Sequence, residues 1–110
     1  MAADAQAALA AALDRMWRQH LPVLIERVDV LDAAAAAFAS GELTARQHQA
    51  AQAAAHKLAG VLGTFGLTRG TVLARELEIV YSRQNEPDAE LAARVQAIAT
   101  ELRAVIATRK

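Results

Sequence analysis

The sequence of 110 residues contains no cysteine, two prolines and only 4% aromatic residues. Without cysteine the chain has no disulfides, no thiol chemistry and no thiolate metal sites, as is common in a reducing compartment. No segment approaches the roughly 18 consecutive apolar residues of a membrane-spanning helix, and the N-terminus lacks the basic and apolar regions of a signal peptide. We therefore expect a soluble, cytoplasmic protein with no membrane association.

The sequence also lacks an excess of charge of either sign. Twelve basic and twelve acidic residues are interspersed along the chain and give a formal net charge of zero. This balance argues against a broad nucleic-acid footprint, so we expect no nucleic acid among the partners. A nucleic-acid-binding helical domain is a weaker alternative that rests only on Arg69, Arg75, Arg83 and Arg94.

Alanine, in contrast, supplies about a quarter of the residues, and 55% of the chain is hydrophobic. Alanine has the highest intrinsic helix propensity, and apolar residues recur at intervals of three and four, which is typical of amphipathic helices. No strand-like alternation competes with this pattern. The expected helices cover residues 3–20, 22–40, 44–66 and 68–83 and the segment from Leu91 to Ile106.

Local signals mark the ends of these helices. Pro22 suits the first turn of a helix, so a new helix is predicted to begin there. Thr44 and Gln47 have the spacing of a capping box. Gly41 and Gly66 can adopt the left-handed conformation that often ends a helix. The turn before the last helix is predicted at residues 84–87, with the sequence Gln-Asn-Glu-Pro.

Short links between amphipathic helices favour antiparallel neighbours. We therefore predict a single all-α domain over residues 1–110, an antiparallel up-down-up-down four-helix bundle with an additional N-terminal helix. The additional helix, residues 3–20, is expected to pack against one end of the bundle. Its apolar stripe consists of Leu9, Leu13, Met16 and Trp17.

The segment AHKLAGVLGTFG is unusual because it contains three glycines in a predicted helix, and an interior glycine destabilises a helix by about 1 kcal/mol relative to alanine. At about 100° per residue, Gly60, Gly63 and Gln52 fall within about 40° of His56, and the leucines fall on the opposite face. His56 is therefore predicted to face solvent beside a shallow notch that a partner can enter. Alternatively, Gly60 and Gly63 permit close contact between two helices.

The spacing of His48, Gln52 and His56 by four residues is one in which a metal site can be sought. Two histidines eight residues apart lie ~12 Å apart along a helix axis, too far to bind one zinc ion together. The sequence has no His-Glu-x-x-His motif and no carboxylate cluster near them. We therefore expect no metal site and no cofactor of the chain's own.

The region from Ala55 to Glu78 carries a wider pattern, whose members are His56, Leu58, Gly60, Gly66, Leu73, Leu77 and Glu78. This pattern resembles the histidine-containing phosphotransfer (HPt) domain family. The resemblance implies that His56 accepts a phosphoryl group from an aspartyl phosphate of a response-regulator receiver domain, or from a kinase, and passes it on. It also implies that Glu78 accepts a hydrogen bond from one imidazole nitrogen, which leaves the other nitrogen free to attack phosphorus. Gly60 matches the small residue that lets the partner approach.

The sequence departs from the family pattern close to the histidine. The family often carries Lys three residues after it, but Ala59 stands there, and Lys57 directly follows His56. Lys57 lies about 100° around the helix from His56, and its flexible side chain is a candidate for stabilising the phosphate as a point charge. The surface that the partner approaches is assigned to Gly60, Gly63, Gln52 and Ala59.

The predicted function is that of a phosphotransfer module in a two-component phosphorelay. The chain has no Gly-rich ATP-binding loop and no nucleophile-and-base set for hydrolysis, so we do not expect an enzyme with its own kinase domain. The expected partners are a receiver domain, which brings the Mg²⁺, and a sensor histidine kinase. We expect the chain to be a monomer. The alternative function is that of an interaction protein, a helical bundle that binds a receiver domain or another helical partner without carrying phosphate.

Overall fold

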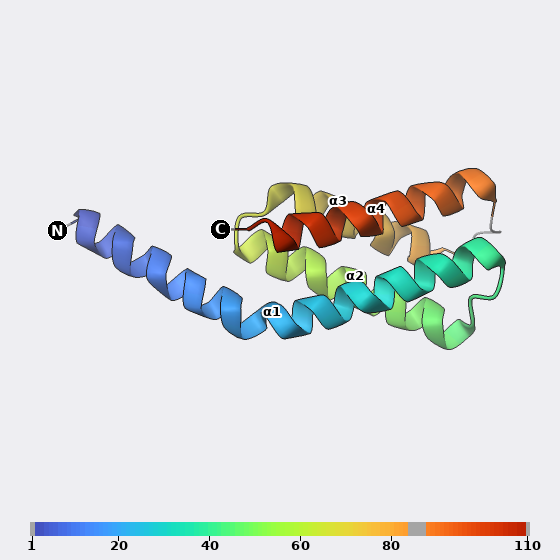
Figure 1. Ribbon diagram of the computed structural model, residues 1–110, viewed down its shortest axis with the longest axis horizontal. Coiled ribbons are helices and arrows are strands. Elements are labelled where there is room, and N and C mark those ends of the chain that lie inside the picture. The colour runs from blue at the N-terminus through green and yellow to red at the C-terminus, as the bar shows by residue number, and fades with distance from the viewer. Residues whose placement is uncertain (1, 84–87, 110) are drawn as a thin grey trace.

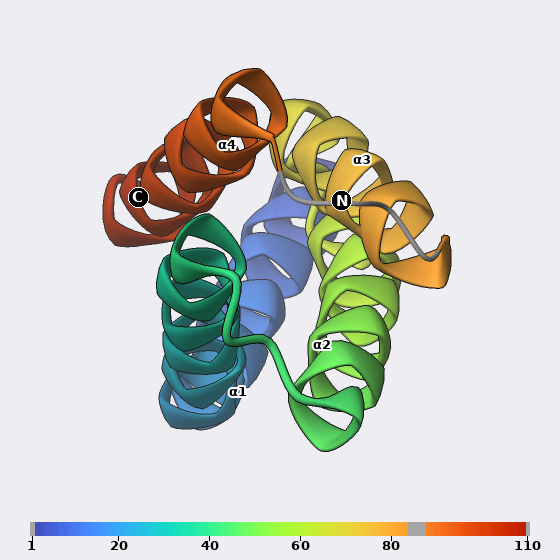
Figure 2. The same cartoon turned by 90° about the vertical axis from the view of Figure 1, so that its right-hand side faces the viewer.

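The computed structural model describes residues 2–83 and 88–109, and within these ranges it contains four α-helices and no strand. The helices are α1 (Ala2–Ser40), α2 (Ala45–Thr64), α3 (Thr68–Ser82) and α4 (Ala89–Ala107). Consecutive helices run in opposite directions (Figure 1) and surround a common core, with α1 beside α2 and α4, and α3 beside α2 and α4 (Figure 2). The predicted antiparallel arrangement is confirmed.

The separate N-terminal helix predicted for residues 3–20 is wrong. α1 continues without interruption through Pro22, which lies inside the helix and is exposed. A proline removes one backbone donor and strains the preceding turn, but the apolar spacing continues on both sides of it through Trp17, Leu24 and Val28, which are buried. Packing of this face therefore outweighs the local cost of the proline.

The N-terminal part of α1 does not pack against the end of the bundle as expected. It extends beyond the other three helices (Figure 1), and residues 2–11 are all exposed. Of the predicted stripe, only Trp17 is buried, whereas Leu9 and Met16 are exposed and Leu13 is half-buried. The stripe therefore packs on the bundle only at its C-terminal end, where Trp17 contacts Phe65.

The other helix boundaries agree with the sequence signals. The Thr44 side chain accepts a hydrogen bond from the backbone N–H of Gln47, and the Gln47 side chain accepts one from the backbone N–H of Thr44, which completes the capping box. Gly41 and Gly66 both have φ of +74°, so both helix ends use the left-handed conformation. The turn predicted at residues 84–87 lies outside the described residues.

The core is a continuous layer of leucine, isoleucine, valine and alanine side chains between the four helices. Its largest fully buried members come from every helix and are Tyr81, Leu24, Leu31, Leu58, Leu62, Leu73, Leu77, Ile98 and Leu102. Alanines of α2 and α3, such as Ala55 and Ala74, fill the narrow spaces between these helices. None of the helices described here is both long and apolar enough to cross a membrane.

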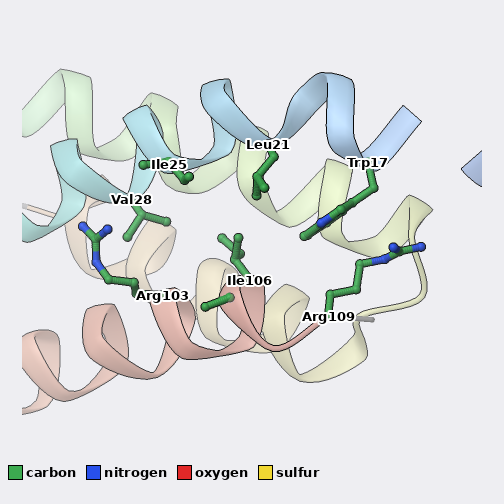
Figure 3. Close-up of a pocket in the computed structure, with 8 residues that line it drawn as sticks. Trp17, Leu21, Ile25, Val28, Arg103, Ile106 and Arg109 are labelled. Carbon is green, nitrogen blue, oxygen red and sulfur yellow. The ribbon is translucent and has the colours of Figure 1, made fainter. Parts of the chain in front are cut away.

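The α1–α4 face carries paired charges around an apolar cavity. Arg103 donates hydrogen bonds to Asp29 and Asp32, which raise the pKa of Arg103 above its usual value. Arg109 pairs with Asp14 at 3.1 Å, and its guanidinium lies 4.9 Å from the centroid of the Trp17 ring. Between the two arginines lies a cavity of about 340 Å³ (Figure 3), lined further by Trp17, Leu21, Ile25, Val28, Ile106 and Ala107.

Candidate functional site

His56 projects from the middle of α2 on the face opposite to the core. Leu58 and Leu62, which lie on the other side of the same helix, are fully buried, and they fix the rotation of α2 about its axis. The side chain of His56 is 73% exposed as a result. The predicted orientation of this imidazole agrees with the structure.

Helix α3 lies close to α2 because Gly70 is buried where the two helices meet. A Cβ atom at Gly70 would lie 2.8 Å from Cδ1 of Leu62 and 3.2 Å from Cγ1 of Val105. The absence of a side chain at Gly70 therefore permits the close packing of α3 on α2. This packing brings Glu78 of α3 next to His56.

The carboxylate of Glu78 holds one nitrogen of the imidazole. Nδ1 of His56 lies 2.7 Å from Oε2 of Glu78. Because an ionised carboxylate only accepts hydrogen bonds, Nδ1 must carry the proton. In the neutral imidazole Nε2 then has a free lone pair. The contact also restrains rotation of a side chain that is otherwise surrounded by solvent.

An open hollow of about 350 Å³ surrounds this pair of residues. Its lining comes from one face of α2 and from α3, and consists of Gln49, Gln52, Ala53, His56, Lys57 and Glu78. The predicted residues Lys57 and Gln52 are thus brought together with His56. Ala53 was not predicted, although its position about 60° from His56 on the helix could have identified it.

The two glycines near His56 have different surroundings. A Cβ atom at Gly60 would meet no atom within 4 Å, so no contact inside the described chain requires glycine there. A Cβ atom at Gly63 would lie 3.4 Å from Oγ1 of Thr71 on α3. Gly63 therefore lies against α3, as the helix-contact alternative has it, whereas Gly60 is on the open side.

Ala59 does not belong to the exposed surface, so the prediction that placed it there is wrong. It is only 3% exposed and packs in the core, and its backbone carbonyl accepts a hydrogen bond from Oγ1 of Thr71 at 3.3 Å. Ala59 lies about 60° from His56 around α2, in the direction opposite to Ala53. This is the side of α2 that α3 covers. Proximity to the histidine on a helical wheel did not account for the neighbouring helix.

The remaining polar candidates lie in other environments. Nε2 of His48 is 3.1 Å from the backbone carbonyl of Arg83. Arg69 and Arg94, two of the arginines in the nucleic-acid alternative, form ion pairs with Glu101 and Glu76. Among residues 2–83 and 88–109, no group of three or more potential ligands could hold a metal ion.

Comparison with known proteins identifies the family of this helical bundle. The chain is 37% identical over 75 residues to Protein RcaC of Microchaete diplosiphon, and the match covers 68% of this chain but only 12% of that protein. No solved structure matches the chain significantly. The model of the Hpt domain matches residues 3–108, almost the whole chain. The chain therefore belongs to the Hpt domain family, whose members are phosphotransfer intermediates of two-component phosphorelays.

Proposed function

We propose that residues 1–110 form a single phosphotransfer module in which Nε2 of His56 accepts a phosphoryl group and passes it on. The donor is an aspartyl phosphate of a response-regulator receiver domain, or a sensor histidine kinase, in the cytoplasm. The observation that carries this proposal is the exposed imidazole whose Nδ1 is held 2.7 Å from the Glu78 carboxylate. A restrained nitrogen with a free lone pair, open to solvent, is what attack on phosphorus requires.

The transfer exchanges one bond to phosphorus for another. The Nε2 lone pair attacks phosphorus in line with the acyl oxygen of the aspartyl phosphate. An N–P bond forms, the P–O bond breaks, and its electron pair stays on the released aspartate. Positive charge develops on the imidazole during attack, and the Glu78 carboxylate stabilises it through the Nδ1 proton. The receiver domain supplies the Mg²⁺ that neutralises the phosphoryl oxygens, so the module needs no cofactor of its own.

Lys57 is the cation of this chain that we assign to the phosphoryl group. It is exposed and lines the same hollow as His56. The position that often carries Lys in the family is occupied by Ala59, which is buried. A lysine is a mobile point charge, so Lys57 can reach toward the phosphoryl oxygens from the neighbouring position on α2.

The receiver domain approaches over the open side of α2. Gly60, whose missing side chain leaves free space, and Gln52, which lines the hollow, lie on this side. An exposed helix surface without a large side chain lets the backbone of a partner come close to His56. Gly63 contributes less, since it faces α3.

The decisive experiment measures transfer of phosphate from a phosphorylated receiver domain to the protein. The parent protein is expected to take up label that is labile to acid and stable to alkali, and His56→Gln is expected to take up none. Binding of the receiver should survive in His56→Gln, because the substitution removes only the nucleophile. Equal labelling of the two proteins would disprove the assignment of His56. Receiver binding without labelling of the parent by any cognate donor would favour the alternative of a pure interaction protein.

Glu78 is tested in the same assay by two substitutions. Glu78→Ala is expected to lower the transfer rate about 10- to 100-fold, since it frees the imidazole to rotate and removes the stabilising charge. Glu78→Gln keeps a hydrogen-bond acceptor and should retain more activity than Glu78→Ala. If both variants transfer phosphate at the parental rate, the carboxylate has no role in orienting the nucleophile.

A further inference from the structure

Helix α1 carries a row of large apolar side chains that the bundle does not cover. The row consists of Leu9, Met16, Val23 and Val30, which are 61%, 43%, 39% and 38% exposed. We call these residues the α1 stripe. Its members are spaced by seven residues along an uninterrupted helix of 39 residues. Its first member, Leu9, lies within residues 2–11, which are all exposed, on the N-terminal part of α1 that extends beyond the other helices (Figure 1).

A seven-residue repeat keeps the four apolar side chains on one narrow line along the helix, which a second helix can cover. Because 3.6 residues make a turn, the stripe drifts by about 20° per heptad around α1, and a left-handed supercoil keeps it in contact with a partner. A lone helical segment is marginally stable in water. The extension of α1 therefore gains most from a partner that is itself a helix with the same repeat.

We propose that the α1 stripe pairs with the α1 stripe of a second copy of this chain, in antiparallel orientation. A two-fold axis near residues 19 and 20 sets Leu9 opposite Val30 of the second copy and Met16 opposite Val23 of the second copy. All eight side chains of the two stripes then lie in one apolar seam. This arrangement replaces the monomer that we expected from the sequence.

Charge complementarity selects the second copy and the antiparallel orientation. Arg15 and Glu26 lie on the same flank of the α1 stripe, about 80° and 60° from Val23 on the helix. Both are exposed, and neither forms an ion pair with any described residue. In the antiparallel pair, Arg15 of one copy and Glu26 of the other lie on the same side of the seam. Their positions along the helix axis differ by only about 3 Å. Parallel pairing would instead place this flank of the two copies on opposite sides of the seam, where Arg15 of one copy does not meet Glu26 of the other.

The α1 stripe contains none of the residues of the phosphotransfer site. His56 and Lys57 lie on α2 and Glu78 lies on α3, so the pairing of α1 is independent of the proposed function. A dimer formed in this way presents two such sites. Loss of pairing and loss of phosphate transfer can therefore be measured separately.

Sedimentation equilibrium of the full chain tests the pairing. The parent is expected to form dimers at concentrations of about 10 to 100 μM. The double variant Met16→Glu/Val23→Glu places charges in the seam and should raise the dissociation constant at least about tenfold. Val72→Glu, at a residue of α3 that is 48% exposed, is the matched control and should dimerise like the parent. Circular dichroism confirms that each variant is folded. A parent that stays monomeric at about 500 μM, or a folded double variant that dimerises normally, would overturn the proposal.

Cysteine crosslinking tests the orientation, and the absence of native cysteine makes each introduced thiol unique. A mixture of Leu9→Cys and Val30→Cys chains should form a disulfide-linked heterodimer under mild oxidation, and neither variant should crosslink efficiently alone. Efficient crosslinking of each variant with itself would indicate parallel helices and contradict the antiparallel model. Arg15→Glu should weaken the dimer severalfold, and Arg15→Glu/Glu26→Arg should restore it. Failure of the double exchange to restore dimerisation would contradict the charge pairing.

Discussion

The α1–α4 face and the α2–α3 face of the bundle use their charged residues differently. On the α1–α4 face, Arg103 is shared between two aspartates, and Arg109 pairs with Asp14 above an aromatic ring. On the α2–α3 face, the exposed cations Arg46, Lys57 and Arg75 have no ion pair with any residue in the described ranges. The carboxylate of Glu78 is engaged by His56.

This difference separates the charges that join α1 to α4 from those of the α2–α3 face that stay unpaired; the unpaired Arg15 and Glu26 flank the α1 stripe and belong to neither group. Exposed ion pairs contribute at most about 1 kcal/mol each to stability, so those on the α1–α4 face mainly align two helices. The electrostatic potential of a cation without an internal partner is not cancelled by a nearby carboxylate. Such a cation therefore attracts an anionic surface. The aspartates and the phosphoryl group of a receiver domain form such a surface. The α2–α3 face is therefore suited to docking on electrostatic grounds as well as by the exposure of His56.

Substitution of Gly60 tests whether the open side of α2 is needed for docking. Gly60→Leu should stabilise the protein by up to about 1 kcal/mol, since leucine is a better helix former and the Cβ position is free. The same substitution should lower phosphate transfer about tenfold because the side chain would stand where the partner approaches. Gly60→Ala is the matched control, with a similar gain in stability and nearly normal transfer. Parental transfer rates in Gly60→Leu would show that the glycine does not provide access.

A paired set of alanine variants compares the two faces directly. Lys57→Ala should lower transfer about three- to tenfold and make it less sensitive to ionic strength, because a cation is removed from the docking face. Arg103→Ala removes a cation that already has two carboxylate partners and should leave transfer unchanged. The measurement is the transfer rate at several salt concentrations. Equal effects of the two substitutions would mean that only net charge matters and that the faces are equivalent.

Much of the fold could be predicted because its signals are local. The capping box at Thr44 and the left-handed glycines at Gly41 and Gly66 satisfy backbone groups within a few residues. The error at Pro22 arose because a proline can either begin a helix or lie within one. The choice depends on whether tertiary packing continues through it. Here packing of Leu24 and Val28 against the other helices decided the outcome, and that information is not local.

The candidate site was predictable to the extent that one helix defines it. The spacing in α2 predicted the exposure of His56 and the location of Gln52 and Lys57 beside it. The burial of Ala59 and the contact between Gly63 and Thr71 depend on where α3 lies across α2. A helical wheel contains no information about a neighbouring helix. Ala59 was therefore assigned to the wrong environment, and the contact of Gly63 with α3 was covered only by the helix-contact alternative. The contact of Glu78 with His56 was expected only through the family resemblance.

A last prediction extends the comparison of the two faces into the core. The hydroxyl of Tyr81, buried below the α2–α3 face, has no hydrogen-bond partner among the described residues, and its burial raises the pKa of Tyr81 to about 12. The usual value is about 10. Between these values the unfolded chain loses the tyrosine proton and the folded chain keeps it, so the free energy of unfolding falls by about 1.4 kcal/mol per pH unit. Below pH 10 this contribution is constant.

Of the substitutions at Gly60, Lys57 and Tyr81, Tyr81→Phe should therefore have the smallest effect at neutral pH. It should change the free energy of unfolding clearly only at alkaline pH. The parent and the variant should differ by less than about 0.5 kcal/mol at pH 7, because phenylalanine keeps the ring and removes only an unpaired hydroxyl. Near pH 11 the variant should be more stable by about 1 kcal/mol, since it has no proton to lose. Urea unfolding at both pH values measures the difference. A large loss of stability at pH 7 would mean that the hydroxyl has a partner after all, and the α2–α3 half of the core would then be as fully paired as the α1–α4 face.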